Sequence, residues 1–145
     1  MTPPGGSGTT SGKVLEDIIV PIARRNGYEI DTQARLGPGL GGGQHWLDGL
    51  VKTPTGDQIA LSLKWQAGPG SVDEKVPYEI VKLLTLMDNN ASIKRAYIII
   101  GGKGFRTRLL SYYRSGEISK YIPSAHLIRI VDIDDIMTLF QKKEV

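Results

Sequence analysis

The sequence has no cysteine and only two histidines among its 145 residues. Without cysteine, neither disulfide bonds nor thiolate metal sites can form, and this absence is typical of proteins from a reducing compartment such as the cytoplasm. Two histidines alone are too few for the ligand sets of structural zinc sites. The longest apolar runs fall short of the ~18 residues that a membrane-spanning helix needs. We therefore expect a cytoplasmic protein with no membrane partner.

The overall composition is that of an ordinary globular protein, with 40% hydrophobic and 23% charged residues. A chain of this length suits one domain with its own core and is too short for two. Residues 1–12 are uncharged and rich in Gly, Pro, Ser and Thr, which predicts a flexible tail before a single domain over 13–145. The net charge of +3 is compatible with a nucleic-acid partner without requiring one.

Hydrophobic spacing predicts four helices and five strands. Helices are expected over 13–27, 71–90, 105–116 and 134–144, and strands over 28–36, 44–53, 57–66, 93–102 and 126–133. Pro21 predicts a kink or early break in the first helix, and the glycine-rich segment 37–43 predicts a mobile loop without regular structure. The order αβββαβαβα implies an α/β fold in which an antiparallel meander and crossover units form a mixed central sheet flanked by helices.

The hairpin over 44–66 carries the residues with the most distinctive chemistry. Alternation gives its second strand an apolar face and a polar face, made of Leu61, Leu63 and Trp65, and of Ser62, Lys64 and Gln66, respectively. A turn near Pro54-Thr55 places Asp48 of the first strand opposite residue 61 or 62. Asp48, Ser62 and Lys64 then share one polar face. They form either a cross-strand ion pair or part of an active site.

An Asp on one strand and, about fifteen residues later, an acidic-x-Lys motif on the next is the pattern of the PD-(D/E)xK nucleases. The segment from Asp48 to Lys64 resembles it, and the element order over residues 13–131 is similar to the restriction-endonuclease-like core of that superfamily. The sequence departs from the pattern in two respects. No proline precedes Asp48, and Ser62 stands where the second acid is usual.

The resemblance extends to a subgroup in which a serine replaces that acid and the following helix supplies the carboxylate. Two candidates follow Lys64 on that helix, Glu79 by 15 residues and Glu74 by 10. Helical phase places Glu79 near the inward face and Glu74 on the opposite side, where it fits a capping box with Ser71. The sequence therefore favours Glu79 as the second acid. Its alternative role is a surface glutamate paired with Lys75 or Lys82.

Phosphodiester hydrolysis needs a cation that stabilises negative charge on the phosphate and activates water. By the resemblance, Asp48, Glu79 and the backbone carbonyl of Leu63 would hold Mg²⁺, with Mn²⁺ as an alternative cation. Lys64 would orient the attacking water or stabilise the developing charge. The residues that would support this site are Glu16, Ser62, Gln66 and Glu74. Glu16 also fits an exposed helical position, and Gln66 a solvated strand end.

Further side chains are candidates for contacting DNA: His45, Lys52, Lys103, Arg106 and Arg108. The GGKGF segment over 101–105 is either a plain turn or a phosphate site at a helix N-terminus. A lone histidine such as His45 more often has a structural role. Asp132 or Asp134 is expected to cap the last helix.

These features favour a Mg²⁺-dependent DNA endonuclease of the restriction, homing or junction-resolving kind. One small domain offers one site, whereas cutting two strands calls for two, so we expect a homodimer or higher homo-oligomer. The alternative is a non-catalytic nucleic-acid-binding module on the same fold, because Ser62 replaces the usual acid.

Overall fold

The computed structural model describes residues 10–145, so most of the predicted tail lies outside the described residues. The described part begins with three consecutive helical segments, α1 (Thr10–Val14), the π-helical turn η1 (Leu15–Ile19) and α2 (Val20–Arg25). The following elements are β1 (Glu29–Leu36), η2 (Leu40–Gly42), β2 (His45–Lys52), β3 (Gln58–Trp65), η3 (Asp73–Lys75), α3 (Val76–Asn89), β4 (Ile93–Gly101), α4 (Thr107–Ser115), η4 (Glu117–Lys120), η5 (Ala125–Leu127), β5 (Ile128–Asp132) and α5 (Ile133–Gln141).

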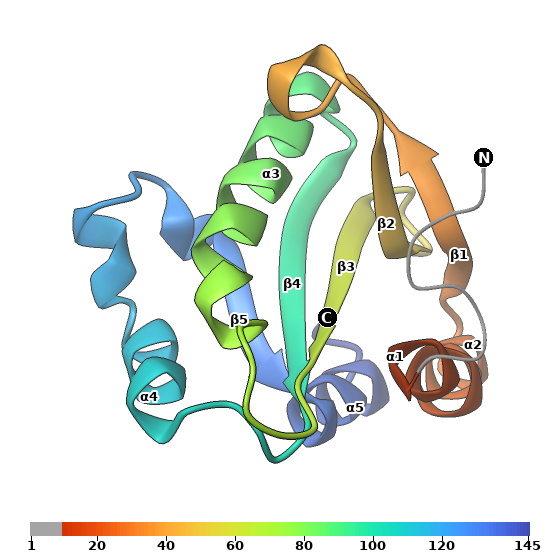
Figure 1. Cartoon of the computed structure of the whole chain (residues 1–145). Helices are drawn as coiled ribbons and strands as arrows, with labels where there is room; N and C mark the ends of the chain where they lie inside the picture. Colours follow the sequence, from red (N-terminus) through yellow and green to blue (C-terminus); the bar gives the residue numbers. More distant parts are fainter. Residues whose placement is uncertain (1–9) are drawn as a thin grey trace.

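The five strands form one sheet in the order β1-β2-β3-β4-β5 (Figure 1). The first three strands pair antiparallel, and β4 and β5 are added in parallel after helical crossovers. The α/β class and the mixed sheet predicted from the sequence are therefore confirmed. The β2–β3 register pairs Gly49 with Leu61, so Asp48 is level with Ser62, one of the two predicted arrangements.

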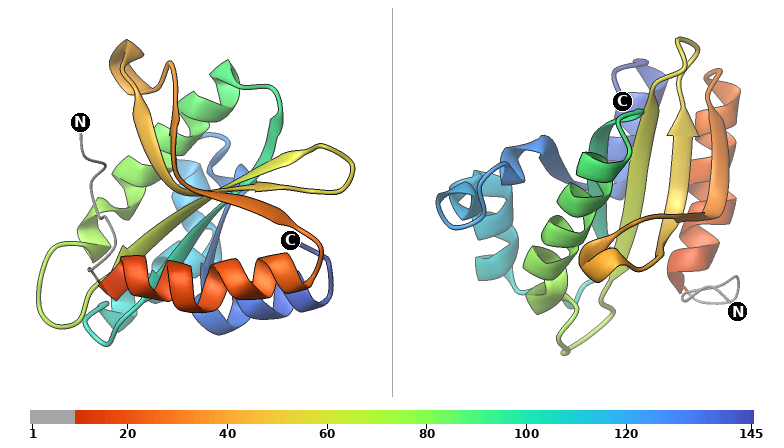
Figure 2. Two further views of the ribbon diagram at one scale, coloured as in Figure 1. Left: turned by 90° about the vertical axis from the view of Figure 1, so that its right-hand side faces the viewer. Right: turned by 90° about the horizontal axis from the view of Figure 1, so that it is seen from above.

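Helices cover both faces of the sheet (Figure 2). The helix formed by α1, η1 and α2 lies beside α5 on one face, while α3 and α4 lie on the other. Each face has its own apolar cluster: Tyr97 and Phe140 belong to the first, and Ile80 and Leu83 to the second. Among residues 10–145, no helix combines the length and apolar character that crossing a bilayer requires.

The N-terminal helix differs from the prediction at both features expected of it. It begins at Thr10 rather than at residue 13, and Gly12 is already buried, so the predicted tail reaches three residues too far. Pro21 does not break the helix, because it lies in the first turn of α2, where a missing N–H costs little. The preceding turn is π-helical, with the Val20 N–H donating to the Leu15 carbonyl. The proline is accommodated by this wider turn.

The glycine-rich segment is also more ordered than predicted. It contains the short 3-10 turn η2, which is closed by hydrogen bonds from Gly39 N–H to Gly43 O (2.6 Å) and from Gly42 N–H to Gly39 O (2.9 Å). The side chain of Asn89 at the end of α3 donates to Pro38 O at 2.9 Å. The β1–β2 connection is thereby attached to the C-terminal end of α3.

Two glycines after β4 allow two loops to pack backbone against backbone. A Cβ atom at Gly104 would stand 2.1 Å from the Gly68 carbonyl oxygen, and one at Gly102 would stand 2.2 Å from the Gln66 carbonyl oxygen. Gly104 N–H donates to Gln66 O at 2.7 Å across the same contact. The connection after β4 therefore rests directly on the connection between β3 and α3.

Replacing Gly104 by alanine should destabilise the protein by about 3 kcal/mol, the upper part of the range for overpacking, because a rigid backbone atom occupies the space. Gly68→Ala is the matched control, since a Cβ there meets nothing within 4 Å. We expect its free energy of unfolding in urea to stay within about 0.5 kcal/mol of the parent. Equal stabilities of the two variants would contradict the close-packing interpretation.

Candidate active site

The site begins where β2 separates from β3. Within the described chain their pairing ends at Gly49 and Leu61, although β2 continues to pair with β1 as far as His45. In place of the next backbone bond, the Asp48 carboxylate accepts a hydrogen bond from the Leu63 N–H, with Oδ2 at 2.6 Å from the nitrogen. The divergence of the two strands thus places a carboxylate beside the backbone of the residue preceding Lys64.

The second carboxylate comes from the first turns of α3. Pro77 lies in the first turn of this helix, where it does not disturb the helical phase. Glu79 is only 4% exposed and points inward on the same side as Val76, Ile80 and Leu83. This is the orientation that the phase argument predicted. It excludes the alternative of a surface glutamate.

Three basic side chains surround the Glu79 carboxylate. Lys64 Nζ lies 3.0 Å from Oε1, and Lys82 Nζ lies 3.9 Å from the same oxygen. His45 Nε2 lies 3.6 Å from Oε2. The strands β2 and β3 and the helix α3 therefore meet at one buried carboxylate, whose two oxygens face different partners.

The two acids titrate in opposite directions from their usual values. Burial alone would raise the pKa of Glu79, but the facing His45 imidazole and the Lys64 and Lys82 ammonium groups outweigh it and lower the pKa from 4.5 to about 2. For Asp48 burial dominates and raises the pKa, while the Leu63 N–H and the Lys64 charge oppose it. The Glu79 charge acts in the same direction as burial. Of the two carboxylates, Asp48 is consequently the one whose negative charge is less fully balanced by nearby positive groups and hydrogen bonds.

A hard divalent cation fits this pair of acids. The residues from 10 to 145 contain no cluster of three or more His, Cys, Asp or Glu side chains suited to metal binding. Two carboxylates completed by a main-chain carbonyl and waters are sufficient for Mg²⁺, which retains much of its hydration. Burial is the main cause of the raised pKa of Asp48 and the Glu79 charge adds to it, and a cation held by the two acids would offset both effects. The poorly balanced charge of Asp48 and the carboxylate oxygens of both acids are therefore compatible with a bound divalent cation.

A family model described as a PD-(D/E)XK nuclease superfamily domain matches residues 7–144. The chain belongs to the PD-(D/E)XK nuclease superfamily. No match was found among the curated proteins or the solved structures. Members of the superfamily are nucleases that typically use divalent metal ions, so a hydrolytic, nucleic-acid-directed role follows at that level.

The residues expected to support a PD-(D/E)XK site are dispersed. Ser62 is buried on β3, two residues before Lys64, at 3% exposure. Glu16 is exposed on the helix that packs against the other face of the sheet. Glu74 does not form the predicted capping box, because no side chain caps this helix start; its carboxylate instead pairs with Arg106 Nη1 at 2.6 Å.

Gln66 is not the solvated strand end that the sequence suggested. It is 4% exposed, and both ends of its amide are hydrogen bonded to loop backbone. Nε2 donates to Gly104 O and Oε1 accepts from Asp73 N–H, each at 2.8 Å. The side chain is therefore not available to contact DNA or water directly.

At the GGKGF segment the structure favours a plain turn over a phosphate site, because a carboxylate of the chain already lies at that helix start. The Arg106 N–H before α4 donates to Asp73 Oδ2 at 3.0 Å, and Gly104 N–H is bonded to Gln66 O. The Arg106 guanidinium is bonded to Glu74 and to Gly70 O. Lys103 and Arg108 are exposed, and Lys52 is exposed at the hairpin end of β2.

The acidic cluster before α5 has a structural role. Asp132 caps this helix, its side chain accepting from Asp135 N–H at 2.7 Å while Asp135 Oδ2 accepts from Asp132 N–H. Arg114 pairs with both carboxylates. Asp132 is therefore the cap, one of the two residues predicted.

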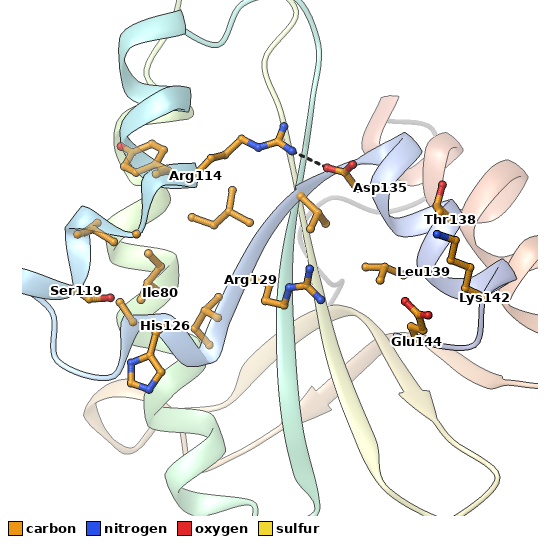
Figure 3. A pocket seen from close by; sticks show the side chains of 17 residues that line it. Ile80, Arg114, Ser119, His126, Arg129, Asp135, Thr138, Leu139, Lys142 and Glu144 are labelled. Carbon is orange, nitrogen blue, oxygen red and sulfur yellow. Dashed lines mark hydrogen bonds and ion pairs between the residues drawn. The ribbon is translucent and has the colours of Figure 1, made fainter.

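A groove of about 580 Å³ lies along β5, between α5 and the segment containing α4, η4 and η5 (Figure 3). Arg114 reaches across it to Asp135, and Arg129 and Lys142 also line it. Neither the two acids nor Lys64 lines this groove. The groove is therefore separate from the place where the side chains of Asp48, Lys64 and Glu79 converge.

Sequence reasoning missed two residues of this region. The sequence suggests Lys82 only as a surface partner of Glu79, although a basic residue three positions along a helix lies on the same side as the acid. Asp73 is the second, and it is fully buried. No local pattern distinguishes Asp73 from a polar residue at a helix start, since its partners are 7 to 40 residues away in sequence.

Proposed function

We propose that the protein is a metal-dependent DNA endonuclease in which Asp48, Glu79 and Lys64 form the catalytic group. The convergence of a β2 carboxylate, a β3 lysine and an α3 carboxylate is the observation that carries the proposal. It supplies, from three separate elements, the two acids and the lysine that the superfamily pattern requires.

The side chains divide the chemistry between them. Asp48, Glu79 and the Leu63 carbonyl would hold Mg²⁺, which when bound stabilises negative charge on the phosphate and activates a water. The Lys64 ammonium, 3.0 Å from Glu79 and about one quarter exposed, is positioned to turn toward a phosphate oxygen or the attacking water. Its ion pair with Glu79 orients it before the substrate arrives. The Leu63 N–H holds Asp48 in a single orientation.

A cleavage assay tests this proposal. Supercoiled plasmid, single-stranded DNA and a four-way junction are incubated with Mg²⁺, Mn²⁺ or EDTA. We expect cleavage of at least one substrate with either cation and none with EDTA. Salt-dependent DNA binding without cleavage under all conditions would support the non-catalytic module instead.

We further propose that the active form is a homodimer or higher homo-oligomer. Each chain offers one set of Asp48, Glu79 and Lys64, and cutting both strands of a duplex at one place calls for two sets. Sedimentation equilibrium of the protein with and without DNA tests this point. A monomer that makes double-strand breaks with first-order dependence on protein concentration would contradict it.

A further inference from the structure

A group of four side chains joins the loop that follows β3 to the loop that follows β4. We call it the loop clamp: Gln66, Asp73, Arg106 and Tyr113. Gln66 joins the connection after β3 to the connection after β4, through Asp73 N–H on one side and Gly104 O on the other. These two connections run side by side at one end of the sheet (Figure 1).

Asp73 is the centre of the clamp. It is 0% exposed, and its carboxylate accepts from the Arg106 N–H at 3.0 Å while the Arg106 guanidinium lies 3.7 Å away. Its carbonyl accepts from Tyr113 Oη at 2.6 Å. A buried carboxylate is costly unless it is paired and hydrogen bonded, so these contacts fix the segment in one conformation.

The location of the clamp gives it a consequence for the site. It holds the chain between Lys64 and Glu79, which are separated by 15 residues. In an acidic-x-Lys motif both groups lie two residues apart on one strand, and the strand alone fixes their distance. Here Ser62 occupies the strand position, so the distance from lysine to acid depends on how this connection is folded.

We propose that the loop clamp is a positioning device that sets the Glu79 carboxylate against Lys64 and so determines the affinity of the site for its cation. Gln66 begins two residues after the lysine, and Asp73 opens the turn that leads into α3. The clamp thus fixes the connection at both ends. The proposal rests on the proposed function, because it concerns the cation held by Asp48 and Glu79.

The test compares Gln66→Met, which keeps the length of the side chain and removes both hydrogen bonds, with the parent. We expect the Mg²⁺ concentration for half-maximal cleavage and the Kd for Mg²⁺ from calorimetry to rise about tenfold, the lower end of what losing a supporting contact costs at metal sites. The rate at saturating Mg²⁺ should change much less. Partial unfolding would instead lower the maximal rate and leave the Mg²⁺ dependence of the folded fraction unchanged.

A second variant and a matched control complete the design. Tyr113→Phe removes only the bond to Asp73 O and should shift the Mg²⁺ dependence in the same direction by a smaller factor. Asn89→Ala removes one hydrogen bond at the opposite end of α3 and should leave the Mg²⁺ dependence of cleavage unchanged. Parental Mg²⁺ affinity in both clamp variants, or an equal shift in the control, would overturn the proposal. If the parent binds Mg²⁺ but cleaves no DNA, the proposed function fails while calorimetry still decides on the clamp.

Discussion

Glu79→Gln should reduce the rate of DNA cleavage by roughly 10²–10³-fold, the loss typical of removing one group that stabilises a charged transition state. The substitution keeps the shape of the side chain but removes the charge that Lys64 and a cation both require. Rates are measured under single-turnover conditions at saturating protein. Glu117→Gln is the control, since Glu117 is an exposed glutamate on η4. It should cleave at nearly the parental rate.

The same substitution should also lower stability in a pH-dependent way. Because the folded pKa of Glu79 is about 2 and its usual value is 4.5, its ionised form stabilises the fold fully above pH 4.5. This contribution is lost as pH falls toward 2. The difference in unfolding free energy between the parent and Glu79→Gln should therefore be large at pH 7 and smaller at pH 3, as measured by urea denaturation. Parental cleavage by Glu79→Gln would eliminate it from the metal site.

Asp48→Asn should also reduce the rate of DNA cleavage by roughly 10²–10³-fold. We nevertheless expect it to raise the melting temperature of the metal-free protein at pH 7. Burial raises the pKa of Asp48, so the folded state pays for keeping this carboxylate ionised. Asparagine removes that cost and can still accept from the Leu63 N–H through its side-chain oxygen. Stabilisation by Mg²⁺, seen in the parent as a rise in melting temperature, should be absent from the variant.

The sign of this effect can be checked with pH. Below pH 3.8 the Asp48 carboxyl is neutral in the folded and unfolded chain alike, so the advantage of the asparagine should disappear there. Asp31→Asn, at an exposed position on β1, is the control and should alter neither cleavage nor the response to Mg²⁺. A lower melting temperature for Asp48→Asn at pH 7 would contradict the assignment of Asp48 as the poorly compensated anion.

The order of elements and the hairpin register were accessible from sequence because both depend on local patterns. Alternation in β3 and the Pro-Thr-Gly turn left only two registers for Asp48, and the observed pairing of Gly49 with Leu61 is one of them. Glu79 could be chosen over Glu74 because helical phase relates each acid to a buried neighbour such as Ile80. Period and spacing were sufficient in these cases.

Contacts between distant segments were not accessible. Gln66 ends a polar strand face, and nothing nearby in the sequence indicates that Gly104 and Asp73 bind its amide. The GGKGF glycines suggested a phosphate loop, whereas Gly104 is required by the approach of Gly68. A run of glycines in the sequence indicates that small residues are required there. It does not indicate which atom of a distant segment lies against them.

The separation of the two apolar clusters has a consequence for how this protein can be altered. The cluster under α1, α2 and α5 includes Leu63 but neither of the acids, and the helix carrying Glu79 packs wholly on the opposite side. Substitutions at positions such as Phe140 or Ile19 can therefore tune thermal tolerance with little effect on the carboxylates. Changes at Ile80 or Leu83 displace the scaffold of Glu79 itself, so stability and catalysis would change together. One side of the sheet is thus open to engineering of robustness, and the other to engineering of activity.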